Sequence, residues 1–241
     1  MKIAEIIRFL IDRFPKGYVF TYNDFMKEVD NKETVIKALN RMAISGKISK
    51  LSKGKYYKPE KTVFGSLQPD QYQIVKDLLE KNGKIIGYLT GYSIYNKLGF
   101  TTQISNVIQI GRNEIRAAFR RNKIKISFIK QKSIITKDNI PLLQILDCIR
   151  YIKKIPDCSI EMACNRLLII IKGLSEKETR AIVRLAKKYP PATRALLGAI
   201  LEENGNRVNS ELLLKSLNPI TTYNLSGAEK VLSTTNRWNI K

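Results

Sequence analysis

The sequence predicts an α+β protein in which an N-terminal winged helix-turn-helix precedes a mixed α/β and helical C-terminal effector domain. Two patterns favour this fold. Within the first sixty residues, three short amphipathic segments come before a basic hairpin, and from Leu142 onward the apolar residues follow helical spacing. The predicted domains are residues 1–60 and residues 61–241, and the second divides into a mixed part (61–136) and a helical part (137–241). A chain of 241 residues is long enough for both.

The first predicted helix carries a continuous apolar stripe. Its members recur three or four residues apart, at Ile3, Ile6, Ile7, Leu10, Ile11 and Phe14. Pro15 to Gly17 ends this helix. Thr21 and Asp24 have the spacing of a capping box, with Asp in place of the usual Glu, and they predict a short second helix that reaches Val29.

A third helix is predicted from Glu33 to Ser45, with Gly46 as its C-terminal cap. Two β-prone runs follow, Lys47–Leu51 and Lys55–Pro59. The three residues between them include Gly54, which is typical of a β-hairpin. Three short helices followed by a hairpin are the elements of a winged helix.

The rest of the chain changes from mixed to helical character. A helix is predicted over Asp70–Lys81, and Thr90 is expected to cap another that ends at Leu98 and Gly99. Strands are predicted at Lys84–Gly87, Asn106–Ile110, Lys123–Ile129 and Ser133–Ile135. Helices are predicted at Leu142–Ile152, Ile160–Ile171, Ser175–Lys188, Ala192–Glu203 and Ser210–Leu217. The last twenty or so residues are polar and are expected to be partly disordered.

The charge of the chain favours a polyanionic partner. Lys and Arg number 43 against 21 Asp and Glu, which gives a net charge of +22. Basic groups that approach phosphates release condensed counterions, so an excess of this size is typical of nucleic-acid binding. The alternative is a solvated basic surface with no such partner. No single segment is a basic tail, so a polyanion surface has to be assembled by folding.

Catalytic signatures are weak. No His is present, which excludes His-based nucleophile pairs and His-ligated zinc. Cys148, Cys158 and Cys164 show no metal-ligand spacing and are expected to be reduced thiols. The acidic pair Glu176 and Glu178 is explained by a capping box. The chain is therefore expected to be non-catalytic and to hold neither metal nor cofactor. Because the N-terminus does not resemble a signal peptide, a cytoplasmic location is expected.

The strongest functional signal is the outer face of the third predicted helix. With the apolar residues facing inward, this face presents Thr34, Lys37, Asn40, Arg41 and Ser45. Asn can pair with adenine and Arg with guanine in the major groove of DNA. The hairpin adds five cations, at Lys47, Lys50, Lys53, Lys55 and Lys58. For Tyr56 and Tyr57, a core role for one of them is favoured, and contact with a sugar or a minor-groove wall is the alternative; Tyr56 is included among the candidate DNA-binding residues. The sequence thus predicts binding to double-stranded operator DNA with inverted repeats; an ordinary solvated face is the alternative.

A second basic cluster lies in the mixed region. It comprises Arg112, Arg116, Arg120, Arg121, Lys123 and Lys125. On a helix, the residues at 112, 116 and 120 would share one face. This cluster is interpreted as a phosphate contact beside the winged helix, as a site for an acidic protein partner, or as a solvated surface.

Several segments resemble the AbiEi-type antitoxins of type IV toxin–antitoxin systems. The resemblance is carried by Gly46–Ile48 and Lys53–Pro59 in the hairpin and by Gly91–Gln103, and more weakly by Ala186–Pro190 and Leu196–Gly198. It implies a DNA-binding transcriptional autorepressor that neutralises a co-encoded nucleotidyltransferase-like toxin. The DNA-contacting surface it implies maps onto the Thr34–Ser45 helix and the Lys47–Lys58 wing.

Within the resemblance, the Leu98–Gln103 segment is expected to be structural. Gly99 would stop a helix, and Thr101 or Thr102 would cap the local backbone. Contact of this segment with a partner is the alternative.

Two other functions remain open from the sequence. One is a transcriptional regulator without a toxin, which senses a ligand through its C-terminal half. The other is a nucleic-acid-processing enzyme that docks through the winged helix, although the sequence lacks the carboxylate constellation that metal-dependent cleavage requires.

Overall fold

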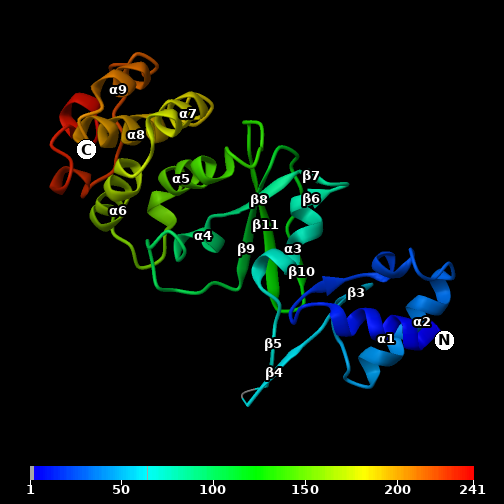
Figure 1. Cartoon of the computed structure of the whole chain (residues 1–241). Coiled ribbons are helices and arrows are strands. Elements are labelled where there is room, and N and C mark those ends of the chain that lie inside the picture. Colours follow the sequence, from blue (N-terminus) through cyan, green and yellow to red (C-terminus); the bar gives the residue numbers. More distant parts are fainter. Residues whose placement is uncertain (1–2, 64) are drawn as a thin grey trace. The chain divides into compact units, whose positions relative to one another are not determined.

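Figure 1 shows the computed structural model, which describes residues 3–63 and 65–241. The fold is α+β, as predicted. The chain divides into two compact units. The first runs to Asp77 and also contains Arg120–Ile124, and the second comprises Leu78–Phe119 and Lys125–Lys241. The boundary thus lies beyond residue 60, and a later segment returns to the first unit. None of the helices in the described residues is long and apolar enough to span a bilayer.

The first unit contains the three predicted helical segments and the predicted hairpin. The helices are α1 (Ile3–Arg13), the 3₁₀ helix η1 (Tyr22–Phe25) and α2 (Lys32–Ile44). Strands β1 (Val19–Phe20), β2 (Ser49–Ser52) and β3 (Lys55–Tyr57) form a sheet in the order β1-β3-β2. The second predicted helix is thus only one 3₁₀ turn, although its capping box forms as expected. Asn31 then caps α2, accepting a hydrogen bond from the Thr34 backbone at 2.9 Å.

The core of the first unit is aromatic and aliphatic. Phe20, Phe25, Ile7 and Leu39 are fully buried, and the rings of Phe20 and Phe25 meet edge to face at 5.7 Å. These residues come from α1, α2, β1 and η1, so burial of the stripes identified in the sequence holds the unit together. A second hairpin follows, formed by β4 (Glu60–Thr62) and β5 (Gly65–Leu67).

The connection to the second unit runs through helix α3 (Gln71–Leu79) and the two-residue strands β6 (Glu80–Lys81) and β7 (Lys84–Ile85). A four-stranded sheet follows in the order β10-β11-β9-β8; β8, β9 and all of β11 but Ile124 belong to the second unit. The strands of the sheet are β8 (Gly87–Thr90), β9 (Val107–Arg112), β10 (Phe119–Arg121) and β11 (Ile124–Lys130), and β9 is parallel to β11 but antiparallel to β8.

A helical layer completes the second unit. The helices are α4 (Tyr92–Tyr95), α5 (Ile140–Arg150), α6 (Ile160–Lys172), α7 (Glu176–Ala186), α8 (Pro191–Glu203) and α9 (Arg207–Leu214). Short 3₁₀ helices lie at Ile152–Lys154, Ala228–Lys230 and Thr235–Trp238 (η2, η3 and η4). The five helices predicted after residue 140 are confirmed, because their apolar periodicity matches a buried face.

Three local predictions for the second unit are wrong. Thr90 does not cap a helix; α4 begins after Gly91, and the Thr90 hydroxyl instead donates to Asp147 at 2.7 Å. Ser133–Ile135 forms no strand, because the Ser133 backbone is held by the Gln131 side chain at 2.8 Å. The C-terminal residues are part of the core: Trp238 is 1 % exposed, and Tyr223 pairs with Ile240. Their apolar residues are too few and too irregularly spaced to show a pattern.

Candidate nucleic-acid interface

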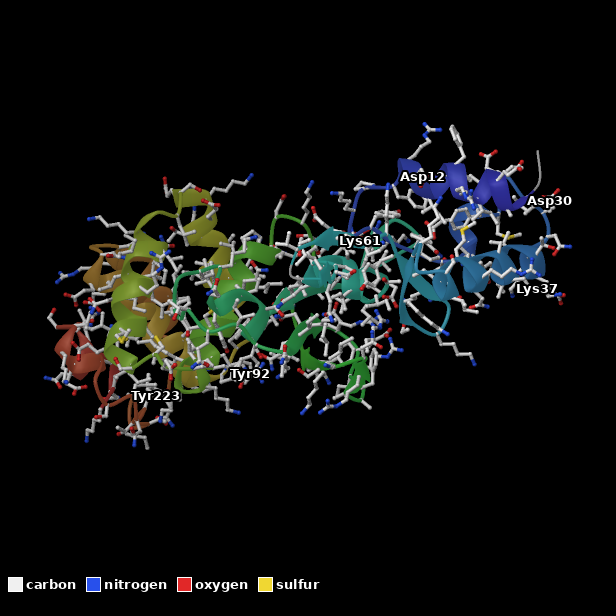
Figure 2. All side chains as sticks on the ribbon, turned by 90° about the horizontal axis from the view of Figure 1, so that it is seen from below. Asp12, Asp30, Lys37, Lys61, Tyr92 and Tyr223 are labelled. Atoms are coloured by element: carbon white, nitrogen blue, oxygen red, sulfur yellow. The ribbon has the colours of Figure 1, made fainter. Side chains whose placement is uncertain are left out.

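Helices α1 and α2 form a shallow groove on the surface of the first unit. Its volume is about 390 Å³, and it is lined by Ala4, Arg8, Thr34, Lys37, Ala38, Arg41, Met42 and Ser45. Four of the five residues predicted on the outer face of the helix therefore line one concave surface. Figure 2 shows Lys37 on α2, with its side chain pointing away from the ribbon.

The groove is electropositive. Arg8, Lys37 and Arg41 are exposed, and within the described part of the chain none of them forms an ion pair with a carboxylate. Arg8 was not among the predicted site residues. Its place on α1, opposite the apolar stripe, was readable from the sequence, but the packing of α1 against α2 that brings it beside Arg41 was not. Three cations without a described ion pair give this groove a positive potential.

Asn40 lies on the same helix and is oriented by the hairpin. Its side-chain oxygen accepts a hydrogen bond from the Tyr56 hydroxyl at 2.7 Å. Tyr56 is only 4 % exposed, and its ring stacks on Phe20 with centroids 6.4 Å apart. The prediction that Tyr56 contacts DNA is therefore corrected: burial removes its ring from the surface and raises the pKa of its hydroxyl. It positions Asn40 instead, and Tyr57 is buried as well.

Two of the hairpin lysines are exposed and available. Lys50 lies on β2, and Lys53 lies in the turn, where Gly54 adopts φ = 72°, a left-handed conformation that favours glycine. Lys47 is half-buried at 3.5 Å from the Asp12 carboxylate, which is a weak contact for a surface pair. The Ser45 hydroxyl donates to the Met42 carbonyl at 3.1 Å, so this side chain helps to end α2.

Lys55 belongs to a structural ion cluster. Its amine lies 2.5 Å from Asp77, which also receives two hydrogen bonds from the Arg121 guanidinium, at 2.6 and 2.7 Å. Burial raises the pKa of Asp77, but the bonds from Arg121 and Lys55 outweigh burial, so the pKa lies below its ordinary value. Burial also lowers the pKa of Lys55, against the opposing effect of Asp77. Asp77 holds both cations through hydrogen bonds, although its single charge offsets only one of the two, so neither side chain is free to reach a phosphate.

Lys58 also has a structural task. Its amine donates to the carbonyl oxygens of Asp12 and Phe14, at 2.7 and 3.0 Å. These carbonyls lie at the end of α1, where a cation satisfies the open acceptors and the negative end of the helix dipole. The predicted basic wing therefore presents Lys50 and Lys53, with Lys47 beside them.

The second predicted basic cluster does not lie on one helical face. No helix spans residues 112 to 121; Arg112 ends β9, Arg116 lies in the following connection, and Arg120 lies on β10. Arg121 is 7 % exposed and bound to Asp77, so it cannot serve a surface patch. The spacing that suggested a helical face comes from two strands and a loop.

The other members of this cluster have separate environments. Arg112 is largely buried and lies 3.7 Å from Glu114. Arg116 lies over the rings of Phe119 and Phe128, at 5.7 and 6.0 Å from their centroids. Arg116, Arg120, Lys123 and Lys125 are exposed, and no ion pair is described for any of them.

The Leu98–Gln103 segment has the structural role expected for it. Gly99 ends the helical turn with φ = 76°, and the Thr101 hydroxyl accepts a hydrogen bond from the Gln103 backbone at 3.2 Å. Phe100 is 3 % exposed, and Arg166 from α6 donates to the Leu98 carbonyl at 2.6 Å. The segment therefore joins the sheet region to the helical layer of the second unit.

Comparison with known proteins identifies a family. Residues 3–179 match the sequence model of a protein family of unknown function, DUF6088. The chain belongs to this family. Among curated proteins, no sequence matches this DUF6088 member. Its fold is similar to that of a crystal structure, the RV2827C protein from Mycobacterium tuberculosis. The TM-score is 0.63 and the identity 13%, over 93% of this chain and 85% of that protein.

Proposed function

We propose that the first unit is a winged helix-turn-helix that binds double-stranded DNA. In this proposal α2 is the recognition helix and the β2–β3 hairpin is the wing. The observation that supports it best is the groove between α1 and α2, where Arg8, Lys37 and Arg41 have no described carboxylate partner. The major groove is wide enough to admit one helix, and the exposed outer face of α2 carries Lys37 and Arg41, while Arg8 lies on α1.

Each group has a distinct task in this proposal. Arg41 reads a base, because a guanidinium can donate two parallel hydrogen bonds to guanine. Asn40 is held by Tyr56 through its oxygen, which leaves its amide nitrogen to donate to a base acceptor. Lys37, Lys50 and Lys53 contact phosphates, which set affinity and orientation but carry no sequence information.

We further propose that the chain is an autorepressor and antitoxin. Its operator would contain inverted repeats, and its second unit would neutralise a co-encoded nucleotidyltransferase-like toxin without itself catalysing a reaction. Support comes from the resemblance of Gly46–Ile48, Lys53–Pro59 and Gly91–Gln103 to AbiEi-type antitoxins. The compact second unit, with its own core, supplies a separate surface for such a partner.

Two measurements test this proposal with the full chain. The first is a gel-shift titration of DNA from upstream of its own gene, against random duplex of equal length. We expect tighter binding to the upstream DNA by at least about a thousandfold, the lower end for specific recognition. The second is growth of cells that express the neighbouring gene with and without this protein. Equal affinity for both DNAs would refute operator recognition, and absence of rescue would refute the antitoxin role.

A second candidate is a regulator that senses a ligand through the second unit. The observation that favours it is a basic cleft in that unit, which the DNA-binding proposal does not use. The same growth assay separates the two candidates, because a ligand sensor would give no protection against a toxin.

A further inference from the structure

The second unit contains a cleft between the end of β11, the end of α5 and the turn that joins α7 to α8. Its volume is about 300 Å³, and it is lined by Lys130, Gln131, Lys132, Arg150, Lys188, Tyr189, Pro190 and Pro191. All of these residues belong to the same unit. The size falls at the lower end of the range for small-molecule sites.

Four of the eight lining residues are cations, and none is acidic. Lys130, Lys132 and Lys188 are exposed, and in the described part of the chain no carboxylate pairs with them. Arg150 lies over the Tyr151 ring at 5.0 Å from its centroid, and no ion pair within 4 Å is described for it. Four positive charges around so small a volume repel one another, and a multivalent anion would remove that repulsion.

The floor of the cleft is a fixed polar network. Gln131 donates to the hydroxyls of Tyr88 and Tyr189, at 2.8 Å each, and Tyr189 donates to the Asp147 carboxylate at 2.9 Å. Tyr88 and Thr90 complete the coverage of Asp147 with bonds of 2.7 Å. Asp147 is fully buried, so it faces these hydroxyls rather than the cleft, and it offsets at most one of the four cations.

Pro190 and Pro191, which form one wall of the cleft, add a weaker contribution to its positive potential. These prolines begin α8, a helix of 13 residues, so the positive end of its dipole lies at the cleft. Both prolines lack a backbone N–H and have a fixed φ, so this wall is rigid and offers little donation of its own. The side chains of Lys130, Lys132, Arg150 and Lys188 supply the binding.

We propose that this cleft binds the di- or triphosphate group of a small ligand such as a free nucleotide. The volume suits a chain of phosphates, and no exposed apolar residue other than the prolines lines the site to hold a base. A single phosphate would engage only some of the four cations, whereas a pyrophosphate group reaches across the cleft. This proposal does not depend on DNA binding by the first unit.

The test uses calorimetric titration of the full chain with phosphate, pyrophosphate, ATP and inorganic triphosphate. We expect one site per chain, and affinity for pyrophosphate and ATP at least about tenfold above that for phosphate, since each added charge-assisted contact strengthens binding. Equal binding of ATP and inorganic triphosphate assigns recognition to the phosphate chain, as proposed. A clear preference for ATP would still place the phosphates here and would add contacts for the nucleoside.

Matched variants locate the site. Lys132→Ala with Lys188→Ala should weaken pyrophosphate binding by at least about tenfold. Lys172→Ala with Lys215→Ala removes the same charge from exposed positions of the second unit that do not line the cleft, and should leave affinity unchanged. Fluorescence of the single tryptophan, Trp238, verifies that each variant folds.

Three results would overturn the proposal. The first is equal affinity of the chain for phosphate and pyrophosphate. The second is an equal loss of pyrophosphate affinity in the cleft and control variants. The third is displacement of pyrophosphate by a random DNA duplex, together with loss of DNA binding in the cleft variant. The last would make the cleft part of a nucleic-acid surface. Failure of operator recognition by Arg41 variants would leave the result for the cleft unchanged, so the two proposals fail independently.

Discussion

The indole ring of Trp238 packs directly on Gly198 of α8, and a Cβ atom at position 198 would overlap the ring. The indole N–H donates to Glu202 at 2.8 Å, one turn further along the same helix. A glycine inside a helix costs about 1 kcal/mol relative to alanine. Here that cost is offset by the close approach, which fixes the C-terminal segment against the core.

We expect Gly198→Ala to destabilise the second unit by about 1–3 kcal/mol, because overpacking exceeds the gain in helix propensity. Urea unfolding followed by Trp238 fluorescence measures this. Gly173→Ala is the matched control: its φ of −78° suits alanine, and a Cβ there meets only ordinary contacts, at 3.5 and 3.7 Å. Equal stability of the two variants would contradict the packing described here.

Asp77 should make the first unit sensitive to acid. Its pKa is lowered in the folded state, so its stabilising effect is complete above the ordinary value of 3.8 and is lost as the pH falls through the lowered folded value. Thermal unfolding followed by far-UV circular dichroism, between pH 2 and pH 6, measures this loss.

The control for that experiment is Asp77→Asn. It should be less stable than the natural chain at pH 6, because the amide cannot form the ion pair with the buried Arg121, and it should lose less stability on acidification. If the two proteins lose stability in parallel from pH 6 to pH 2, the carboxylate does not act as described.

The contribution of Asp147 to stability should depend on pH in the opposite direction to that of Asp77. Burial raises its pKa, and the hydrogen bonds from Tyr88, Thr90 and Tyr189 and the charge of Arg150 only partly offset burial. The protonated form is therefore favoured by folding, and the contribution of this group falls as the pH rises from the ordinary value through the raised one.

Asp147→Asn keeps an oxygen that accepts from Tyr88 and Thr90 but cannot ionise. We expect its stability relative to the natural chain to increase as the pH rises from about 4 towards neutrality. Urea unfolding of both proteins, followed by Trp238 fluorescence at several pH values, gives this difference. A difference that does not vary with pH would show that the pKa of Asp147 is not raised.

The DNA-binding residues should divide into two classes. Arg41→Ala should cost about 1–3 kcal/mol on operator DNA and much less on random DNA, as expected for a base contact. Lys53→Ala should weaken both by similar factors and reduce the salt dependence by about one unit, as expected for a phosphate contact. Gel shifts at several salt concentrations, with Lys172→Ala as control, measure this; equal losses for Arg41→Ala on both DNAs would refute base reading.

The helices were predictable where the apolar residues are periodic, and contacts between distant residues were not. The apolar residues from Ile3 to Phe14 fall on one side only in a helix, so α1 forms as expected. Arg112 and Arg116 have helical spacing by coincidence, and only the pairing of β9 with β11 excludes a helix there. The contact between Asp77 and Arg121 joins residues 44 positions apart, and no local pattern indicates which cation a carboxylate will neutralise.

The same limit applied to the candidate site. The outer face of α2 could be derived from the sequence because it is the complement of a buried stripe. The roles of Tyr56 and Lys55 could not, since alternation in a three-residue strand does not reveal which face is covered. The cleft of the second unit could not be predicted from the sequence either, because its cations come from three separate elements.

The return of Arg120–Ile124 to the first unit constrains how this architecture can be inherited. A recombination event that exchanges only the N-terminal third between relatives would separate Asp77 from its native Arg121, and the incoming piece would need a compatible partner already present in the recipient. Gene fusions at this boundary should therefore be disfavoured, and the two units should diversify together by point substitution rather than by the shuffling of modules.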